Sequence, residues 1–398
     1  MNYTKHTLIN GVRVILAPMN STKAVSIVVL VGAGSNYESK EINGISHFLE
    51  HLFFKGTKTR PRAGDINKAL DRLGADHNAF TSKEMTSFWV KTADKYFDES
   101  LDIVSDILTQ PLFKEEELEK EKGVIMQEIS MYEDIPQRKV YEVWDEMLYP
   151  NQPAGRSIAG TKEIISSLRR KDILEYRKKN YIAQNIVVTV AGNFEPSSVL
   201  KKVDKVFKKI IKGKIPSKKP VVEKQKSPIV KIVNKDTDQT HLILGVRTFG
   251  MFDERKYALG LLGVILGGNS SSKLFAEIRE KLGLAYYVSA FSEQLTDSGY
   301  LIAKAGIPKR SLKKACNKIV KLMGEFKSRE ISEKELKFAK DFLQGTISLG
   351  LESSDDVALF YGEQELFHKK IMSVDDIWKK YQKVTPRDIF KISKEIFR

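Results

Sequence analysis

His47-Phe48-Leu49-Glu50-His51 is the stretch of this chain from which both the fold and the chemistry can be worked out. In a helix, residues four apart lie on one face, so His47 and His51 can reach a single metal ion. Glu50 follows His47 by three residues and can point at a water molecule beside that ion. Two neutral imidazoles and a nearby carboxylate are the first parts of a site that activates water on zinc.

Such a zinc site needs a third protein ligand from elsewhere in the chain. The best candidate is Glu128, and Glu121 lies two helical turns earlier on the same face of its helix. A buried helix face with two carboxylates needs a cation opposite it, which a metal site provides. Taken alone, Glu121 and Glu128 would instead be interpreted as part of a solvated Lys/Glu-rich face, and the histidine pair could be a surface accident or a core pair.

Composition indicates a globular protein of more than one domain. The chain has 398 residues, of which 41% are hydrophobic and 29% charged, and no apolar run is long enough to span a bilayer. The N-terminus shows neither an apolar signal segment nor an Arg-rich presequence. Cys316 is the single cysteine, which excludes an intramolecular disulfide and a cysteine-based zinc site. We therefore expect a cytoplasmic protein that does not associate with a membrane.

The net charge of +15 raises the question of a nucleic-acid partner. The lysines are spread along the whole chain, and no zinc-finger, RNA-recognition or helix-turn-helix signature is present. A Lys-rich solvated surface is the simpler interpretation, so we expect no nucleic-acid partner.

The chain is expected to be a duplication. The polar, proline-containing segment 213–228 is typical of a linker and divides the chain into residues 1–212 and 229–398. Each half opens with strand-like runs, such as Val25–Val31 and Ile229–Val233, and then alternates strands with helices. This pattern predicts an α+β protein of two homologous domains, each a largely antiparallel sheet with helices packed on one face. The second half lacks the His/Glu pattern, so it must contribute something other than metal ligands.

The quoted residues resemble the M16 metallopeptidases, the group of pitrilysin, insulin-degrading enzyme and mitochondrial processing peptidase, and especially their short bacterial members. The order H-x-x-E-H is the inverted zinc-protease motif of that family. The resemblance covers almost the whole chain and includes the following segments: Gly34–Glu38, Gly44–Thr57, Ala75–Thr81, Gly160-Thr161, Tyr181, Ala191-Gly192, Leu266–Phe275 and Arg279–Tyr286. It implies the LuxS/MPP-like metallohydrolase fold in both halves.

The resemblance also implies roles for the residues of the first half. His47, His51 and Glu128 would bind one Zn²⁺ per chain, and Mn or Co could occupy the same ligands. Glu50 would be the general base that takes a proton from the attacking water. Glu121 would support His51 from behind or assist catalysis.

Substrate contacts are implied as well. Arg279 and Tyr286 match an Arg and a Tyr, seven residues apart, that hold the substrate and polarise the scissile carbonyl from the C-terminal domain; without the resemblance they could be a surface Arg and a strand Tyr. Asn78-Ala79-Phe80 matches an edge strand on which a peptide lies as an added β-strand.

We therefore expect a zinc-dependent endopeptidase that hydrolyses unfolded peptides or small protein fragments inside a closed chamber. The resemblance implies a chamber of four such domains, which predicts a homodimer, although a heterodimer with a related subunit is also compatible. The alternative is a non-catalytic M16-like subunit that acts as a scaffold or peptide-binding partner.

Overall fold

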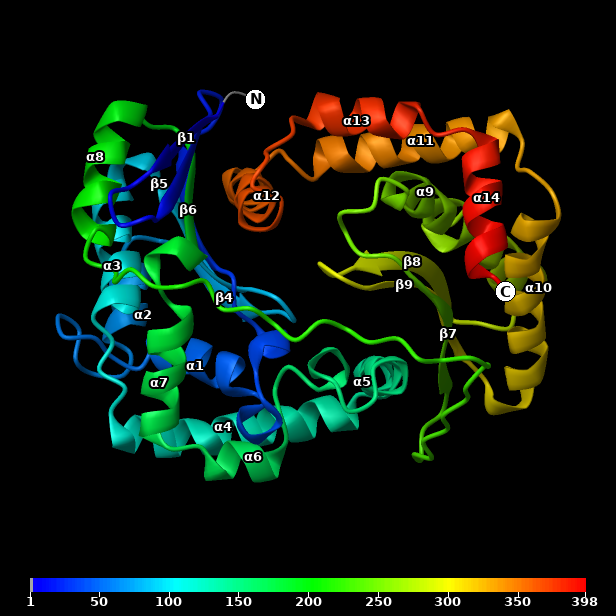
Figure 1. Cartoon of the computed structure of the whole chain (residues 1–398), viewed down its shortest axis with the longest axis horizontal. Coiled ribbons are helices and arrows are strands. Elements are labelled where there is room, and N and C mark those ends of the chain that lie inside the picture. The colour runs from blue at the N-terminus through cyan, green and yellow to red at the C-terminus, as the bar shows by residue number, and fades with distance from the viewer. Residues whose placement is uncertain (1–2) are drawn as a thin grey trace. The chain divides into compact units, whose positions relative to one another are not determined.

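A computed structural model describes residues 3–398 and divides them into two compact units (Figure 1). Unit 1 comprises residues 3–131, 151–219 and 350–371, and unit 2 comprises residues 132–150, 220–349 and 372–398. Both units combine a sheet with helices, as expected for two α+β domains. Their boundaries differ from one cut at 213–228, because each unit takes one helix from the other half of the sequence.

Unit 1 is built on a six-stranded sheet in the order β1-β2-β6-β3-β5-β4. Only β2 and β6 are parallel, and the other neighbours are antiparallel. The strands are β1 (Thr4–Thr7), β2 (Arg13–Pro18), β3 (Ala24–Val31), β4 (Asp76–Thr81), β5 (Thr86–Ala93) and β6 (Ile186–Gly192). The helices are α1 (Ile45–Phe53), α2 (Asp65–Arg72), α3 (Phe97–Thr109), α4 (Glu115–Asp134), α6 (Lys162–Ser167), α7 (Arg170–Asn180), α8 (Pro196–Phe207) and α12 (Ser354–Phe367).

Helices were expected on one face of each sheet, but both faces of the unit 1 sheet are covered. Helix α12, from the second half of the sequence, packs on the face opposite the main core. Val25, Ile27 and Val29 of β3 belong to the main core under α1, α3 and α8. The alternate residues face α12: the Ser26 hydroxyl hydrogen-bonds that of Ser354 at 2.8 Å. Figure 1 shows the sheet between α12 on one side and α3 and α8 on the other. A continuous apolar strand such as β3 needs this second cover.

The burial of α1 fixes the side chains that carry the chemistry. Ile45, Phe48, Leu49 and Leu52 are fully buried and have the spacing of a core-facing helix stripe. The residues between them, at positions 47, 50 and 51, are only partly buried and share the opposite face. Packing of the apolar stripe therefore turns both histidines and the glutamate to one side of the helix.

Unit 2 contains a three-stranded antiparallel sheet in the order β7-β9-β8. Helices α9, α10 and α14 contribute its core, and α5 contacts β7, with Trp144 of α5 against Tyr300 of β9. The strands are β7 (Thr240–Thr248), β8 (Tyr287–Gln294) and β9 (Gly299–Ile307). The helices are α5 (Pro136–Leu148), α9 (Lys256–Gly267), the π-helix η6 (Phe275–Lys281), α10 (Leu312–Ser328), α11 (Glu333–Leu349), α13 (Val374–Gln382) and α14 (Pro386–Ile396).

The prediction of a strand at Ile229–Val233 is wrong. These residues form no strand, and Val230 and Ile232 are 83% and 77% exposed. A strand requires a backbone partner, and none of the described strands pairs with this segment. The predicted α+β class with two related, largely antiparallel units is confirmed, and none of the described helices has the length and apolarity needed to cross a membrane.

Candidate metal centre

The N-terminus of α1 is held by a buried carboxylate. Glu38 accepts hydrogen bonds from the backbone N–H groups of Gly44 and Ser46, at 2.7 and 2.8 Å, and from the Asn43 side chain at 2.9 Å. Burial raises the pKa of Glu38, and these hydrogen bonds offset that effect only in part. An acceptor is favourable here because the first N–H groups of a helix have no partner within it.

Gly44 is required at this helix start. Its φ is 96°, and a Cβ at this position would lie 2.7 Å from the Ala159 carbonyl oxygen. The close approach of the two backbones fixes Gly44, directly before the first residue of α1 and three residues before His47, so the position of the first histidine follows from this turn.

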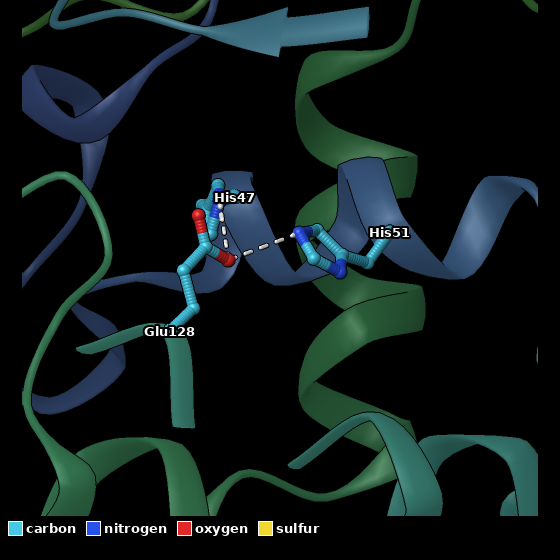
Figure 2. A group of neighbouring side chains, drawn as sticks. All are labelled: His47, His51 and Glu128. Carbon is cyan, nitrogen blue, oxygen red and sulfur yellow. Dashed lines mark ion pairs between the residues drawn. The ribbon is translucent and has the colours of Figure 1, made fainter. Parts of the chain in front are cut away.

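Three side chains from two helices converge on one point. His47 and His51 extend from α1 and Glu128 from α4, and Figure 2 shows one carboxylate oxygen of Glu128 between the two imidazoles. The Oε2 atom of Glu128 lies 3.6 Å from Nε2 of His47 and 3.5 Å from Nε2 of His51. The structure thus brings together the three residues predicted to bind metal.

These distances fit a shared ion better than direct hydrogen bonds. Both exceed the N–H···O range of about 2.7–3.2 Å. Two ligand atoms bound tetrahedrally to zinc at about 2.0–2.1 Å are about 3.3–3.4 Å apart, close to the separations here. Two imidazole nitrogens and one carboxylate oxygen are also the donors that zinc takes in sites that keep a position open. The residues present therefore fit a zinc ion.

The two imidazoles differ in their electrostatic surroundings. Burial, together with the charge of His51, lowers the pKa of His47 to about 4, so its ring is neutral at neutral pH, as a metal ligand must be. Burial also disfavours the protonated form of His51. The hydrogen bond that the His51 ring donates to Glu121, with the charges of Glu50, Glu128 and Glu121, outweighs that effect and raises the pKa of His51.

Glu121 lies behind His51. Its Oε2 is 3.1 Å from Nδ1 of His51, and its Oε1 is 2.7 Å from the Lys55 ammonium. Burial alone would raise the pKa of this 4%-exposed acid, but its hydrogen bonds with His51 and Lys55 lower it. A carboxylate at Nδ1 fixes the tautomer that leaves Nε2 free for metal. This geometry favours the supporting role for Glu121 over a direct part in catalysis.

Glu50 lies on the same side of α1 as the histidines. One of its carboxylate oxygens, Oε2, accepts a hydrogen bond from the Thr81 hydroxyl at 2.5 Å. Burial raises the pKa of Glu50, while the Thr81 hydrogen bond and the charge of His51 act in the opposite direction. A buried carboxylate with a raised pKa beside a metal site is a suitable proton acceptor.

The expected substrate strand is an edge strand. Within residues 3–398, β4 pairs only with β5, so the other backbone edge of Asn78, Ala79 and Phe80 has no strand partner. Ala79 packs on the main core, and Asn78 is exposed. An edge of this kind can accept a peptide as an added strand.

Arg279 and Tyr286 lie side by side in unit 2. Arg279 is in η6, Tyr286 directly precedes β8, and the guanidinium carbon is 5.7 Å from the centre of the tyrosine ring. Tyr286 is 73% exposed. Their predicted role on the substrate stays a prediction.

Three residues at the centre were not predicted to have a role from sequence. Lys55 follows His51 by four residues, and this spacing could have identified it as a partner of the same helix face. Thr81 directly follows the expected substrate strand, but nothing local indicates its contact with Glu50. Glu38 carries no sequence signal for its capping role, because it acts from six residues before Gly44.

Comparison with known families agrees with this fold. The profile described as Insulinase (Peptidase family M16) matches residues 13–162, and the profile of the Peptidase M16 inactive domain matches residues 167–343. Together they cover most of the chain. The chain therefore belongs to peptidase family M16.

Named relatives are similar over nearly the full chain. The uncharacterized zinc protease YmxG of Bacillus subtilis (strain 168) is 36% identical over 395 residues, which cover 99% of this chain and 95% of that protein. The uncharacterized zinc protease SCO5738 of Streptomyces coelicolor is 32% identical, with coverage of 98% and 86%. A crystal structure of a protease from Helicobacter pylori is similar with a TM-score of 0.93 at 26% identity, covering 100% of this chain and 97% of that one. These likenesses support a zinc metallopeptidase.

Proposed function

We propose that the chain is a zinc-dependent endopeptidase that hydrolyses unfolded peptides or small protein fragments. The observation that carries this proposal is the convergence of His47, His51 and Glu128, with Glu50 on the same helix face. A non-catalytic subunit of this family would have no need for a complete donor set with a neighbouring proton acceptor.

The proposed chemistry divides the work among these side chains. Zinc, held by His47, His51 and Glu128, would polarise the attacking water and the scissile carbonyl. Glu50 would accept the proton of the water and deliver it to the leaving amine. Glu121 and Lys55 would keep His51 in the correct tautomer and orientation throughout.

Substrate binding is proposed to use backbone pairing. A peptide added to the free edge of β4 would be recognised through its main chain, which suits unfolded substrates of varied sequence. Arg279 and Tyr286 would hold the peptide and stabilise the developing oxyanion. We also propose a homodimer that encloses the substrate, a state supported by the domain number implied for family members and testable by light scattering of the purified protein.

The experiment that tests the function is cleavage of an unstructured fluorogenic peptide by the wild type and by Glu50→Gln. We expect zinc-loaded wild-type protein to cleave the peptide internally and a chelator to stop it. The Glu50→Gln variant should lose at least about 100-fold in kcat because it cannot accept a proton, while its zinc content stays unchanged.

Tyr286→Phe serves as a second variant in the same assay and should lower kcat with zinc retained. A fully active Glu50→Gln variant would remove Glu50 as the base. Wild-type protein without zinc or cleavage would refute the enzyme proposal.

A further inference from the structure

The contact between Thr81 and Glu50 joins the edge strand to the metal-binding helix. Thr81 is the last residue of β4, and its hydroxyl donates to Oε2 of Glu50 at 2.5 Å. Side chains alternate along a strand, so Thr81 shares a face with Ala79, which packs on the main core, and β4 contacts α1.

The position of Thr81 is itself well determined. Thr81 pairs with Thr86 across the β4–β5 ladder, and the Thr86 hydroxyl donates to the Ala33 carbonyl at 2.8 Å. The turn that follows Thr81 is fixed as well: the backbone N–H groups of Ser35 and Asn36 donate to the carbonyls of Ser82 and Lys83. The hydroxyl is therefore presented to Glu50 from rigid backbone.

We propose that Thr81 is a positioning residue that orients the Glu50 carboxylate for proton transfer and links this orientation to the strand that binds substrate. The inference rests on the proposed function, in which Glu50 is the base and β4 is the substrate strand. Thr81 itself would touch neither the metal nor the reacting atoms and would act only through Glu50.

The chemistry of the contact explains its effect. A glutamate side chain has three rotatable bonds, so its carboxylate can adopt many orientations. A hydrogen bond from a hydroxyl to a carboxylate is charge-assisted and therefore stronger than one between neutral groups, so it can hold one of these orientations. With Oε2 occupied by Thr81, Oε1 is left as the oxygen that accepts the proton. A carboxylate free to rotate would spend less time in the productive orientation, which lowers turnover more than substrate binding.

The test compares Thr81→Val with Thr81→Ser. Valine keeps the shape and strand preference of threonine but removes the hydroxyl, whereas serine keeps the hydroxyl and removes the methyl group. We expect Thr81→Val to lose about 10–100-fold in kcat, part of the usual contribution of a general base, with KM and zinc content little changed. Thr81→Ser should recover most of the activity.

A matched control is available on the neighbouring strand β5, directly after the residue that pairs with Thr81. Ser87 of β5 pairs with Phe80, and no hydrogen bond is found for its buried hydroxyl among the described residues. Ser87→Ala removes a hydroxyl from the same region without removing a contact to Glu50. We expect its kcat to equal that of the wild type.

A double variant separates positioning from general damage. If Thr81 acts through Glu50, Thr81→Val should reduce the residual activity of Glu50→Gln no further, because the group that it orients is already lost. A wild-type kcat for Thr81→Val, an equal loss in Thr81→Ser, or a further loss in the double variant would each overturn the proposal. Full activity of Glu50→Gln would instead overturn the assignment of the base, whatever the Thr81 variants show.

Discussion

At the scale of single residues, the geometry of the metal centre depends on the partner of each ring nitrogen of His51. Nδ1 faces Glu121, whose other oxygen is bound by Lys55, and this leaves Nε2 toward Glu128. An imidazole that lacks such a partner can rotate or adopt the other tautomer, and both changes weaken a metal bond. We therefore expect Glu121 to contribute to metal affinity without being a ligand.

Replacement of Glu121 tests this role. Glu121→Gln should weaken zinc binding by about 10–100-fold, the usual cost of losing a partner behind a metal-binding histidine. Competition with a chromophoric chelator measures the affinity directly. Glu116→Gln is a suitable control, because Glu116 is an exposed acid in the same helix. Equal zinc affinity in Glu121→Gln and the wild type would show that Glu121 does not support His51.

At the scale of elements, the geometry of the site depends on where α1 begins. Sequence spacing correctly places the histidines and Glu50 on one face of a helix. The buried apolar residues of α1 recur with the helical period, so the polar residues between them fall on the opposite face. The spacing could not show how the helix start is fixed, since Glu38 reaches the backbone of Gly44 and Ser46 through a turn of irregular structure. Tertiary contacts of this kind leave no periodic signal.

Glu38→Gln tests the importance of the helix start. The amide would direct an N–H₂ group toward backbone N–H donors, and an unsatisfied buried donor costs about 1–3 kcal/mol. We expect a lower midpoint of thermal unfolding and weaker zinc binding than in the wild type, followed by circular dichroism and chelator competition. Glu41→Gln, at an exposed acid of the short 3₁₀ helix between Glu38 and Gly44, should change neither quantity. Wild-type stability and affinity in Glu38→Gln would contradict the capping role.

At the scale of the whole molecule, the chain contains two related α+β units. The α+β class and the two related units follow from strand and helix patterns, and the fold is as expected. These patterns could not predict that α5, from the first half of the sequence, belongs to unit 2 and that α12, from the second half, belongs to unit 1. Both faces of β3 and β6 are apolar, which indicates a second cover for the sheet, but nothing in the pattern says which helix provides it.

The strand pattern at Ile229–Val233 failed for a related reason. Alternation and β-branched residues describe a segment that can form a strand, whereas a strand forms only when a partner offers backbone hydrogen bonds. The residues of the metal centre were easier to predict, because zinc chemistry limits the side chains and a helix limits their spacing. Thr81 contacts Glu50 from β4, so neither zinc chemistry nor the spacing of residues in α1 could have predicted it.

The assignment of His47, His51 and Glu128 as zinc ligands can be tested by a crystal structure of the zinc-loaded protein with anomalous diffraction data at the zinc absorption edge. We expect one strong anomalous peak per chain, at about 2.0–2.2 Å from Nε2 of His47, Nε2 of His51 and a carboxylate oxygen of Glu128. The Glu50 carboxylate should lie beside the metal without binding it. A zinc peak at other residues, or none at these three in fully loaded protein, would show that His47, His51 and Glu128 do not form the metal site.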